Sequence, residues 1–117
     1  MSAKYFTKAK NLSATSGGAS GDVVYTCPPN YTSLIKYLIV SNGGATSAKK
    51  YSIQWYEAAT TTYHIIVDEV SLAASTNEVV LEGGCIALQA GDQIVAFEES
   101  SSDFHITLSG EEYYKTA

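Results

Sequence analysis

Residues 85–99 read CIALQAGDQIVAFEE, and this stretch decides which fold class suits the chain. Two short apolar runs, 86–88 and 94–97, flank the turn-forming residues Ala90, Gly91 and Asp92. Glycine adopts backbone angles that other residues avoid, and an aspartate side chain can hydrogen-bond to the nearby backbone. The stretch therefore predicts a hairpin-like unit of two short strands, with its turn at a corner of a β-sandwich.

Segments of alternating apolar and polar residues continue on both sides of this unit. Successive side chains of a strand point to opposite faces, so alternation predicts strands with one buried face. On three of these segments the residues expected to face inward are Tyr51, Ile53 and Trp55, then Tyr63, Ile65 and Val67, and finally Phe104, Ile106 and Leu108. Phe97 is expected to belong to the same core.

Eight or nine short strands are expected in total, and helical periodicity is hard to find. The remaining strands are expected at residues 22–27, 33–42, 49–57, 60–70, 77–83 and 103–114. Regular short strands without helices are typical of a sandwich or a closed barrel. The predicted fold class is all-β, a single antiparallel β-sandwich of the immunoglobulin-like or jelly-roll-like type.

The length of 117 residues suits one domain, which we place at residues 22–117. Residues 1–21 are polar and end in TSGGASG, which indicates an N-terminal arm with a flexible loop. The segment KYFTKAKNL within the arm forms an edge strand only if a partner surface supplies the pairing. Its residues Lys4, Lys8 and Lys10 suit a solvated tail better than a binding patch.

The segment LIKYLIV at residues 34–40 is apolar on nearly both faces of an expected strand. A strand buried on both sides lies in the centre of a sheet or beneath a neighbouring subunit. Both alternatives remain open from the sequence.

The charge distribution excludes several classes of partner. Seven lysines stand against twelve aspartates and glutamates, for a net charge of −5, and the chain has no arginine. Nucleic acids and anionic membranes attract basic, arginine-containing surfaces, so neither is an expected partner. Neither a signal peptide nor a membrane span is recognisable, which predicts synthesis in a cytosol-like compartment.

Cys27 and Cys85 are the only cysteines, and neither has a closely spaced cysteine or histidine that would indicate a metal site. Both are expected to be small buried hydrophobic residues in the reduced state. A disulfide is the less favoured alternative, and a catalytic thiol is less favoured still.

Other groups capable of catalysis are present without a catalytic pattern. His64 and His105 fall on the expected outer faces of strands, and a two-histidine metal site with Asp68 or Asp103 is conceivable but not required by the spacing. Adjacent acidic residues point to opposite faces of a strand and do not pair. The glycine-rich runs lack a phosphate-binding motif. We therefore expect no enzyme, no cofactor and no metal.

Aromatic side chains are the best candidates for contacts with another molecule. They combine a large apolar area with a polar group, which suits contacts between subunits or, alternatively, stacking on a sugar. The candidate assembly contacts are Tyr5, Phe6, Leu38, Tyr56, Tyr113 and Tyr114.

Several short motifs follow one another along the chain. A Tyr-Thr-x-Pro strand end precedes an Ile-Lys-x-Leu strand, a loop that begins with Asn, an Ile-x-Trp-Tyr strand, a Leu-x-Ala-Gly-Asp-x-Ile turn and a final run that ends in Glu. The residues that carry them are Tyr25 to Pro28, Ile35 to Leu38, Asn42, Ile53 to Tyr56, Leu88 to Ile94 and Ile106 to Glu112. Over about residues 22–114, this pattern resembles small virion structural proteins of tailed bacteriophages.

The resemblance implies a β-sandwich subunit of a phage particle that acts by binding. A capsid decoration or cement protein is expected first: it would bind the major capsid protein in many copies and stabilise the shell. The alternative is a tail-fibre, neck or receptor- or glycan-binding appendage component. A homo-oligomer, expected to be a trimer, would be made in the host bacterial cytoplasm and would reside in the virion.

Overall fold

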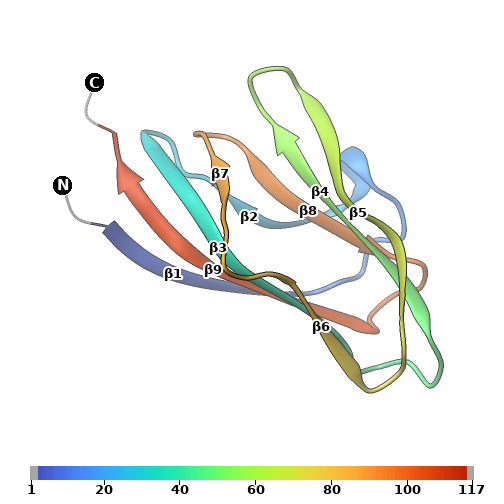
Figure 1. Cartoon of the computed structure of the whole chain (residues 1–117). Coiled ribbons are helices and arrows are strands. Elements are labelled where there is room, and N and C mark those ends of the chain that lie inside the picture. The colour runs from blue at the N-terminus through green and yellow to red at the C-terminus, as the bar shows by residue number, and fades with distance from the viewer. Residues whose placement is uncertain (1–2, 116–117) are drawn as a thin grey trace.

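Nine strands form two antiparallel sheets that pack face to face in the computed structural model, which describes residues 3–115 (Figure 1). Sheet A has the order β1 (Ala3–Asn11), β9 (Phe104–Tyr114), β3 (Tyr31–Asn42) and β6 (Thr76–Leu81), and β7 (Ile86–Leu88) also pairs with β3. Sheet B has the order β2 (Asp22–Thr26), β8 (Gln93–Glu98), β4 (Lys49–Glu57) and β5 (Thr62–Leu72). The predicted β-sandwich is confirmed. Within residues 3–115, no helix has the length and apolarity needed to cross a membrane.

The stretch at residues 85–99 forms a corner between the two sheets. Strand β7 belongs to sheet A and β8 to sheet B, so the predicted corner is present but the two strands do not form a hairpin. Gly91 turns the chain at a φ of 88°, an angle that favours glycine. Its N–H donates to the carbonyl oxygen of Cys27 at 3.0 Å, and the Cys27 N–H donates to the carbonyl oxygen of Asp92 at 2.9 Å.

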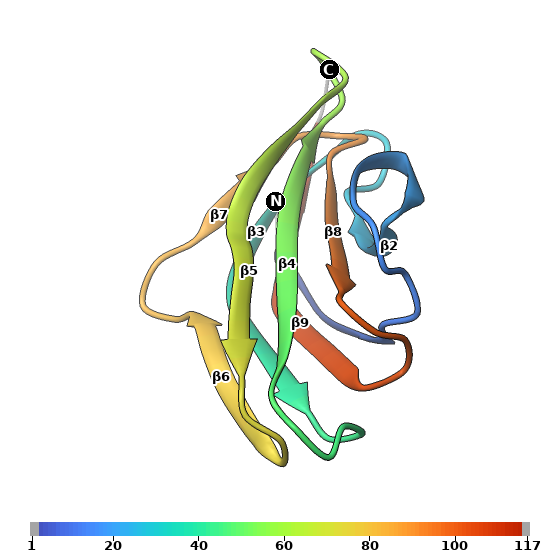
Figure 2. The same cartoon turned by 90° about the vertical axis from the view of Figure 1, so that its right-hand side faces the viewer.

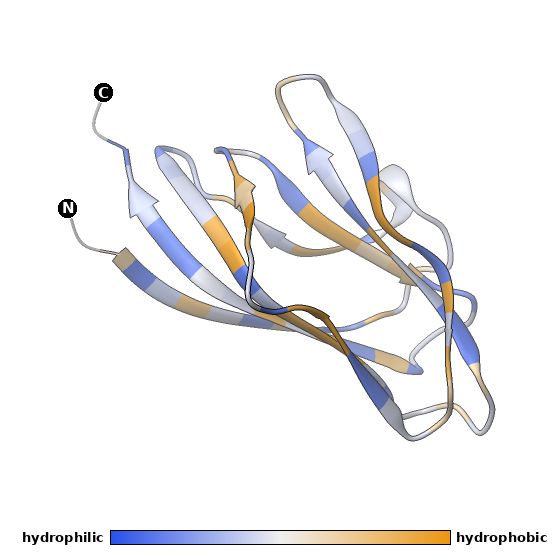
Figure 3. Ribbon diagram, viewed as in Figure 1, coloured by the Kyte–Doolittle hydropathy of each residue, from blue (hydrophilic) through white to orange (hydrophobic). Residues whose placement is uncertain are grey.

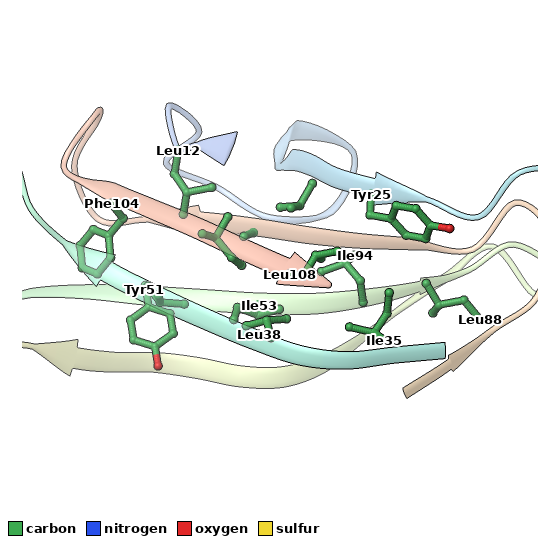
Figure 4. Packing of buried hydrophobic residues seen from close by; sticks show 14 of the residues in the cluster. Leu12, Tyr25, Ile35, Leu38, Tyr51, Ile53, Leu88, Ile94, Phe104 and Leu108 are labelled. Carbon is green, nitrogen blue, oxygen red and sulfur yellow. The ribbon is translucent and has the colours of Figure 1, made fainter. Parts of the chain in front are cut away.

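The core lies between the sheets and draws on both of them (Figure 4). Several of the expected inward residues are fully buried, namely Tyr51, Ile53, Phe104, Ile106 and Leu108. Trp55 is half-buried and packs against this cluster. Phe97 is also half-buried but lies outside the cluster, which corrects its expected place in the core.

A bulge in β3 explains why LIKYLIV is apolar on both faces. Ile35 pairs with Gly110 of β9 and Tyr37 pairs with Ser109, which leaves Lys36 as an extra, exposed residue. The bulge reverses the strand's phase, so Ile35 and Leu38 both point into the core although they are three positions apart. Strand β3 lies between β9 and β6, which confirms the central position as the correct alternative.

A second bulge corrects the expected phase of β5. Ile53 pairs with Val67 and Gln54 pairs with Ile65, so Ile66 is the extra residue. Ile66 and Val67 pack against the core, whereas Ile65 is 64% exposed instead of buried. Alternation alone cannot reveal such a shift, because a bulge depends on the pairing with the neighbouring strand.

The N-terminal residues belong to the sandwich and do not form a separate arm. Strand β1 pairs with β9 along its whole length, and Leu12 is 1% exposed in the core. The following loop packs on the outer face of sheet B, where a Cβ on Gly17 would lie 2.7 Å from the Phe97 ring. The domain therefore begins at β1 and not at residue 22.

Candidate interaction surface

The lateral side of the sandwich between β5 and β6 exposes much more aliphatic surface than a covered core edge would. These are the edge strands of their sheets on this side (Figure 2). We define the aliphatic seam as the partly or largely exposed residues Ile65, Ile66, Val67, Val70, Val79, Val80, Leu81 and Ile86. Hydrophobic colouring accordingly extends onto both edge strands (Figure 3). Exposed apolar surface, here contributed mainly by Ile65, Val70 and Val79, marks sites of protein–protein contact.

The local sequence explains why this side stays open. Residues 82–85, which link β6 to β7, are all exposed, and the chain projects away from the sandwich there (Figure 2). Strand β5 is interrupted by its two register shifts, and Glu69 at the second of them has a positive φ of 48°. Irregular edges resist strand addition, so this side is suited to side-chain contacts.

Four acidic residues lie on or directly after β5 and β6, the edge strands that carry the aliphatic seam. We define the acidic rim as the exposed residues Asp68, Glu69, Glu78 and Glu82. The buried Tyr51 donates its hydroxyl hydrogen to Glu78, and burial followed by this hydrogen bond raises the pKa of Tyr51. Within residues 3–115, no lysine or histidine lies within 4.0 Å of a rim carboxylate. Lys50 and Glu69 both line a hollow of about 230 Å³.

The opposite lateral side, between β1 and β2, is closed by aromatic packing. The Phe6 ring of β1 stacks on the Tyr25 ring of β2 with centroids 4.5 Å apart. Beneath them, the Tyr25 hydroxyl donates to Glu112 at 2.5 Å and lies 2.6 Å from Ser33 Oγ. Burial, and then the bond to Glu112, raise the pKa of Tyr25. These contacts hold β1 to the rest of the domain.

A row of lysines follows the same edge. Lys4, Lys8 and Lys10 alternate along β1 on the face that carries Phe6, and all three are exposed. Lys4 Nζ lies 3.9 Å from Glu112 Oε1, while no carboxylate of residues 3–115 lies within 4.0 Å of Lys8 or Lys10. The expected solvated tail is thus an ordered lysine row on an edge strand, a placement that discourages pairing between identical edges.

The outer face of sheet A has a shallow hollow of about 400 Å³ whose rim includes Tyr5, Lys36 and Glu111. Lys36 Nζ lies 3.3 Å from a Glu111 carboxylate oxygen, and the Tyr113 hydroxyl donates to the same residue. The Tyr113 bond, and then Lys36, lower the pKa of Glu111, while this bond raises the pKa of Tyr113. The charged groups of this hollow are therefore satisfied within the chain.

The six candidate contact residues predicted from the sequence differ in how exposed their side chains are. Tyr5 and Tyr114 are 77% and 49% exposed, so both are available to a partner. Tyr113 and Tyr56 are half-buried, and Tyr56 stacks with Tyr63 at a centroid distance of 4.6 Å.

One of the six predicted contacts is wrong: Leu38 is 0% exposed in the core, so it cannot face another subunit. Phe6 is half-buried, stacks on Tyr25 and also lines the shallow hollow with Tyr5. The prediction missed the aliphatic seam. Its sequence signal is the consecutive apolar triplets at 65–67 and 79–81, which leave apolar side chains on both faces of an edge strand.

The cysteine and histidine side chains considered for catalysis are distant from one another or make contacts that stabilise the fold. Cys27 is buried and Cys85 is exposed, which corrects the expectation that both are buried, and both thiols are free. His64 shares the Trp55 face, with ring centroids 4.6 Å apart, and its Nε2 lies 3.0 Å from Glu57 Oε1. Within residues 3–115, no cluster of three or more His, Cys, Asp or Glu side chains suits a metal ion.

The buried Glu98 carboxylate accepts hydrogen bonds from the backbone. Its carboxylate accepts a hydrogen bond from the Phe104 N–H at 3.0 Å and a longer one from the Asp103 N–H at 3.4 Å. Burial raises the pKa of Glu98, since no cation among residues 3–115 lies within 4.0 Å to compensate its charge. The group fastens the loop between β8 and β9.

No family model matches this sequence, and no curated protein matches it. A solved structure reported as "Bacillus endospore appendages form a novel family of disulfide-linked pili" is similar to this chain. The TM-score is 0.51 with 11% sequence identity, and the match covers 98% of this chain and 88% of that chain. At this identity the likeness supports the β-sandwich fold alone.

Proposed function

We propose that this chain is a virion structural protein of a tailed bacteriophage and acts as a capsid decoration or cement protein. It would bind the major capsid protein in many copies and stabilise the shell without catalysing a reaction. The observation that carries a contact function is the aliphatic seam, in which Ile65, Val70 and Val79 are 64%, 38% and 40% exposed. Many modest contacts of this kind add up when subunits are linked on one particle.

The choice of a phage particle rests on the sequence resemblance over about residues 22–114. Its motif residues include Asp92 at the corner between the sheets and Ile53 in the core. These residues stabilise the sandwich. The resemblance therefore supports the fold directly and the phage role only through that shared fold.

A filamentous appendage is the second candidate, and one observation favours it. The structural neighbour with a related sandwich comes from endospore appendages described as disulfide-linked pili. This chain also has an exposed free thiol at Cys85, in the link that projects beside the seam. A tail-fibre or neck component of a phage would fit the same observation.

Binding to shells tests the proposal directly. Purified protein should cosediment with empty capsids of the phage that encodes it and raise the temperature at which these shells disrupt. The variant Ile65→Asp should fold but bind less, because Ile65 is 64% exposed and lies on the seam. A matched control is Val23→Asp, which alters a 43% exposed residue of β2, on the opposite edge of sheet B from the seam. Absence of binding by the parent protein, with filaments visible by electron microscopy, would favour the appendage candidate instead.

A further inference from the structure

We propose that copies of this chain associate head to tail, with the lysine row of one copy against the acidic rim and aliphatic seam of the next. The inference rests on the proposed function only in its requirement for a multi-copy subunit. It needs no capsid, so it can be tested on the isolated protein.

The topology places the two surfaces on opposite sides of one molecule. Strands β1 and β6 are the two edges of sheet A, and β2 and β5 are the two edges of sheet B. One lateral side is therefore β1 with β2, and the other is β5 with β6. Each surface faces away from the other, so contact between them requires two copies.

The charges of the two sides are complementary. The lysine row supplies Lys4, Lys8 and Lys10, and the acidic rim supplies four carboxylates with no cation within 4.0 Å among residues 3–115. Two lysine rows would repel each other, and so would two acidic rims. A two-fold dimer through either side is thus disfavoured, and the head-to-tail arrangement is the one that pairs opposite charges.

The apolar part of the interface is complementary as well. Lysine side chains bury their aliphatic stems along apolar surface while the ammonium group reaches a charged partner. Stems from the lysine row can therefore cover the seam between β5 and β6 while their ammonium groups reach the rim.

The available area is sufficient for a specific contact. The Cα atoms span 49 × 26 × 19 Å, and the strands run along the longest dimension. A lateral side is therefore long enough to carry a standard protein interface of about 800 Å² per partner. Repetition of a head-to-tail contact yields either a closed ring or an open filament.

Charge reversal with mixing is the decisive experiment. One double variant is Lys8→Glu with Lys10→Glu, and the other is Asp68→Lys with Glu82→Lys. All four positions are exposed, and none of the four side chains has an ion-pair partner within residues 3–115. Glu78 is left unchanged because it accepts the Tyr51 hydrogen bond. Circular dichroism and thermal unfolding establish that both variants fold.

Sedimentation velocity at about 50 mM and about 500 mM salt is the readout, without any shells present. The parent protein should self-associate at low salt and dissociate at high salt. Each folded double variant alone should stay monomeric, whereas their equimolar mixture should associate. In the mixture, the reversed positions 8 and 10 of one variant again face opposite charges at the reversed positions 68 and 82 of the other, and the second type of junction joins the unaltered row to the unaltered rim. The variant Ile65→Asp should associate less than the parent at low salt.

Three outcomes would overturn the proposal. They are a monomeric parent at about 100 µM and low salt, association unaffected by either reversal, and a mixture that stays monomeric. Loss of association in only one of the two double variants would indicate a two-fold contact and would also refute it. Failure of shell binding with intact self-association would refute the capsid role and leave this inference standing.

Discussion

The indole Nε1 of Trp55 donates a hydrogen bond to Oδ2 of Asp92 at 3.3 Å, which ties β4 to the corner between the two sheets. The same carboxylate accepts the N–H of Ala58 at 2.9 Å and the N–H of Gln89 at 3.0 Å. Asp92 is 3% exposed, so its acceptor atoms are directed at protein donors. One aspartate therefore joins the link between β4 and β5 to the turn between β7 and β8.

Replacement of this carboxylate should be costly. Asp92→Ala leaves three N–H donors without their acceptor, and we expect a loss of roughly 3 kcal/mol in the free energy of unfolding. Urea denaturation followed by Trp55 fluorescence measures the change. Asp22→Ala is the matched control, since within residues 3–115 that carboxylate accepts only from Ser13 and Ala14 near the surface. Equal costs for the two variants would contradict the central role of Asp92.

Glu98 should make the stability of the fold fall as pH rises. Because burial raises the folded-state pKa, the folded protein holds this proton more tightly than the unfolded chain does. Stability from this group is complete below the ordinary glutamate pKa and declines as pH rises toward the folded-state pKa. Glu98→Gln removes the titration, so its stability relative to the parent should improve from pH 4 to pH 7.

Urea midpoints at pH 4, 5.5 and 7 test this expectation for Glu98. Glu99→Gln serves as the neighbouring control, because Glu99 is exposed. A constant difference between the parent and Glu98→Gln across this pH range would show that the buried carboxyl titrates normally.

Gly110 should tolerate no side chain. A Cβ atom there would lie 2.0 Å from the carbonyl oxygen of Leu34, at the point where β3 bulges toward β9. We expect Gly110→Ala to cost on the order of 4 kcal/mol or to prevent folding, since both strands are central to sheet A. Gly84→Ala is the control, because nothing lies within 4 Å of a Cβ at that position. Thermal unfolding of both variants distinguishes a close backbone approach from a general intolerance of alanine.

The two thiols should react at very different rates. Cys85 is exposed, whereas Cys27 is 0% exposed and burial raises the pKa of its thiol. Iodoacetamide should therefore modify one thiol in the native protein and the second only in denaturant, as intact mass would show. Cys85→Ser should leave no thiol reactive under native conditions. Rapid double modification of the native parent would be inconsistent with the buried position of Cys27.

Local sequence was sufficient to predict the fold class and the approximate positions of β2 to β9. Alternation identified β4 and β9, and the Ala-Gly-Asp turn identified the corner at Gly91 and Asp92. The alternation of side chains along a strand and the backbone angles of a turn are set by residues close together in sequence, so both can be predicted locally.

Pairing between distant segments decided the rest. The bulges at Lys36 and Ile66 reverse the phase of their strands, and β9 supplies β1 with the partner that its own neighbourhood lacks. The sequence carries the lysines of β1 and the carboxylates near β5 and β6 as separate clusters. Only the order of strands in the two sheets places them on opposite sides of one molecule, because lateral position depends on long-range hydrogen bonding and not on local periodicity.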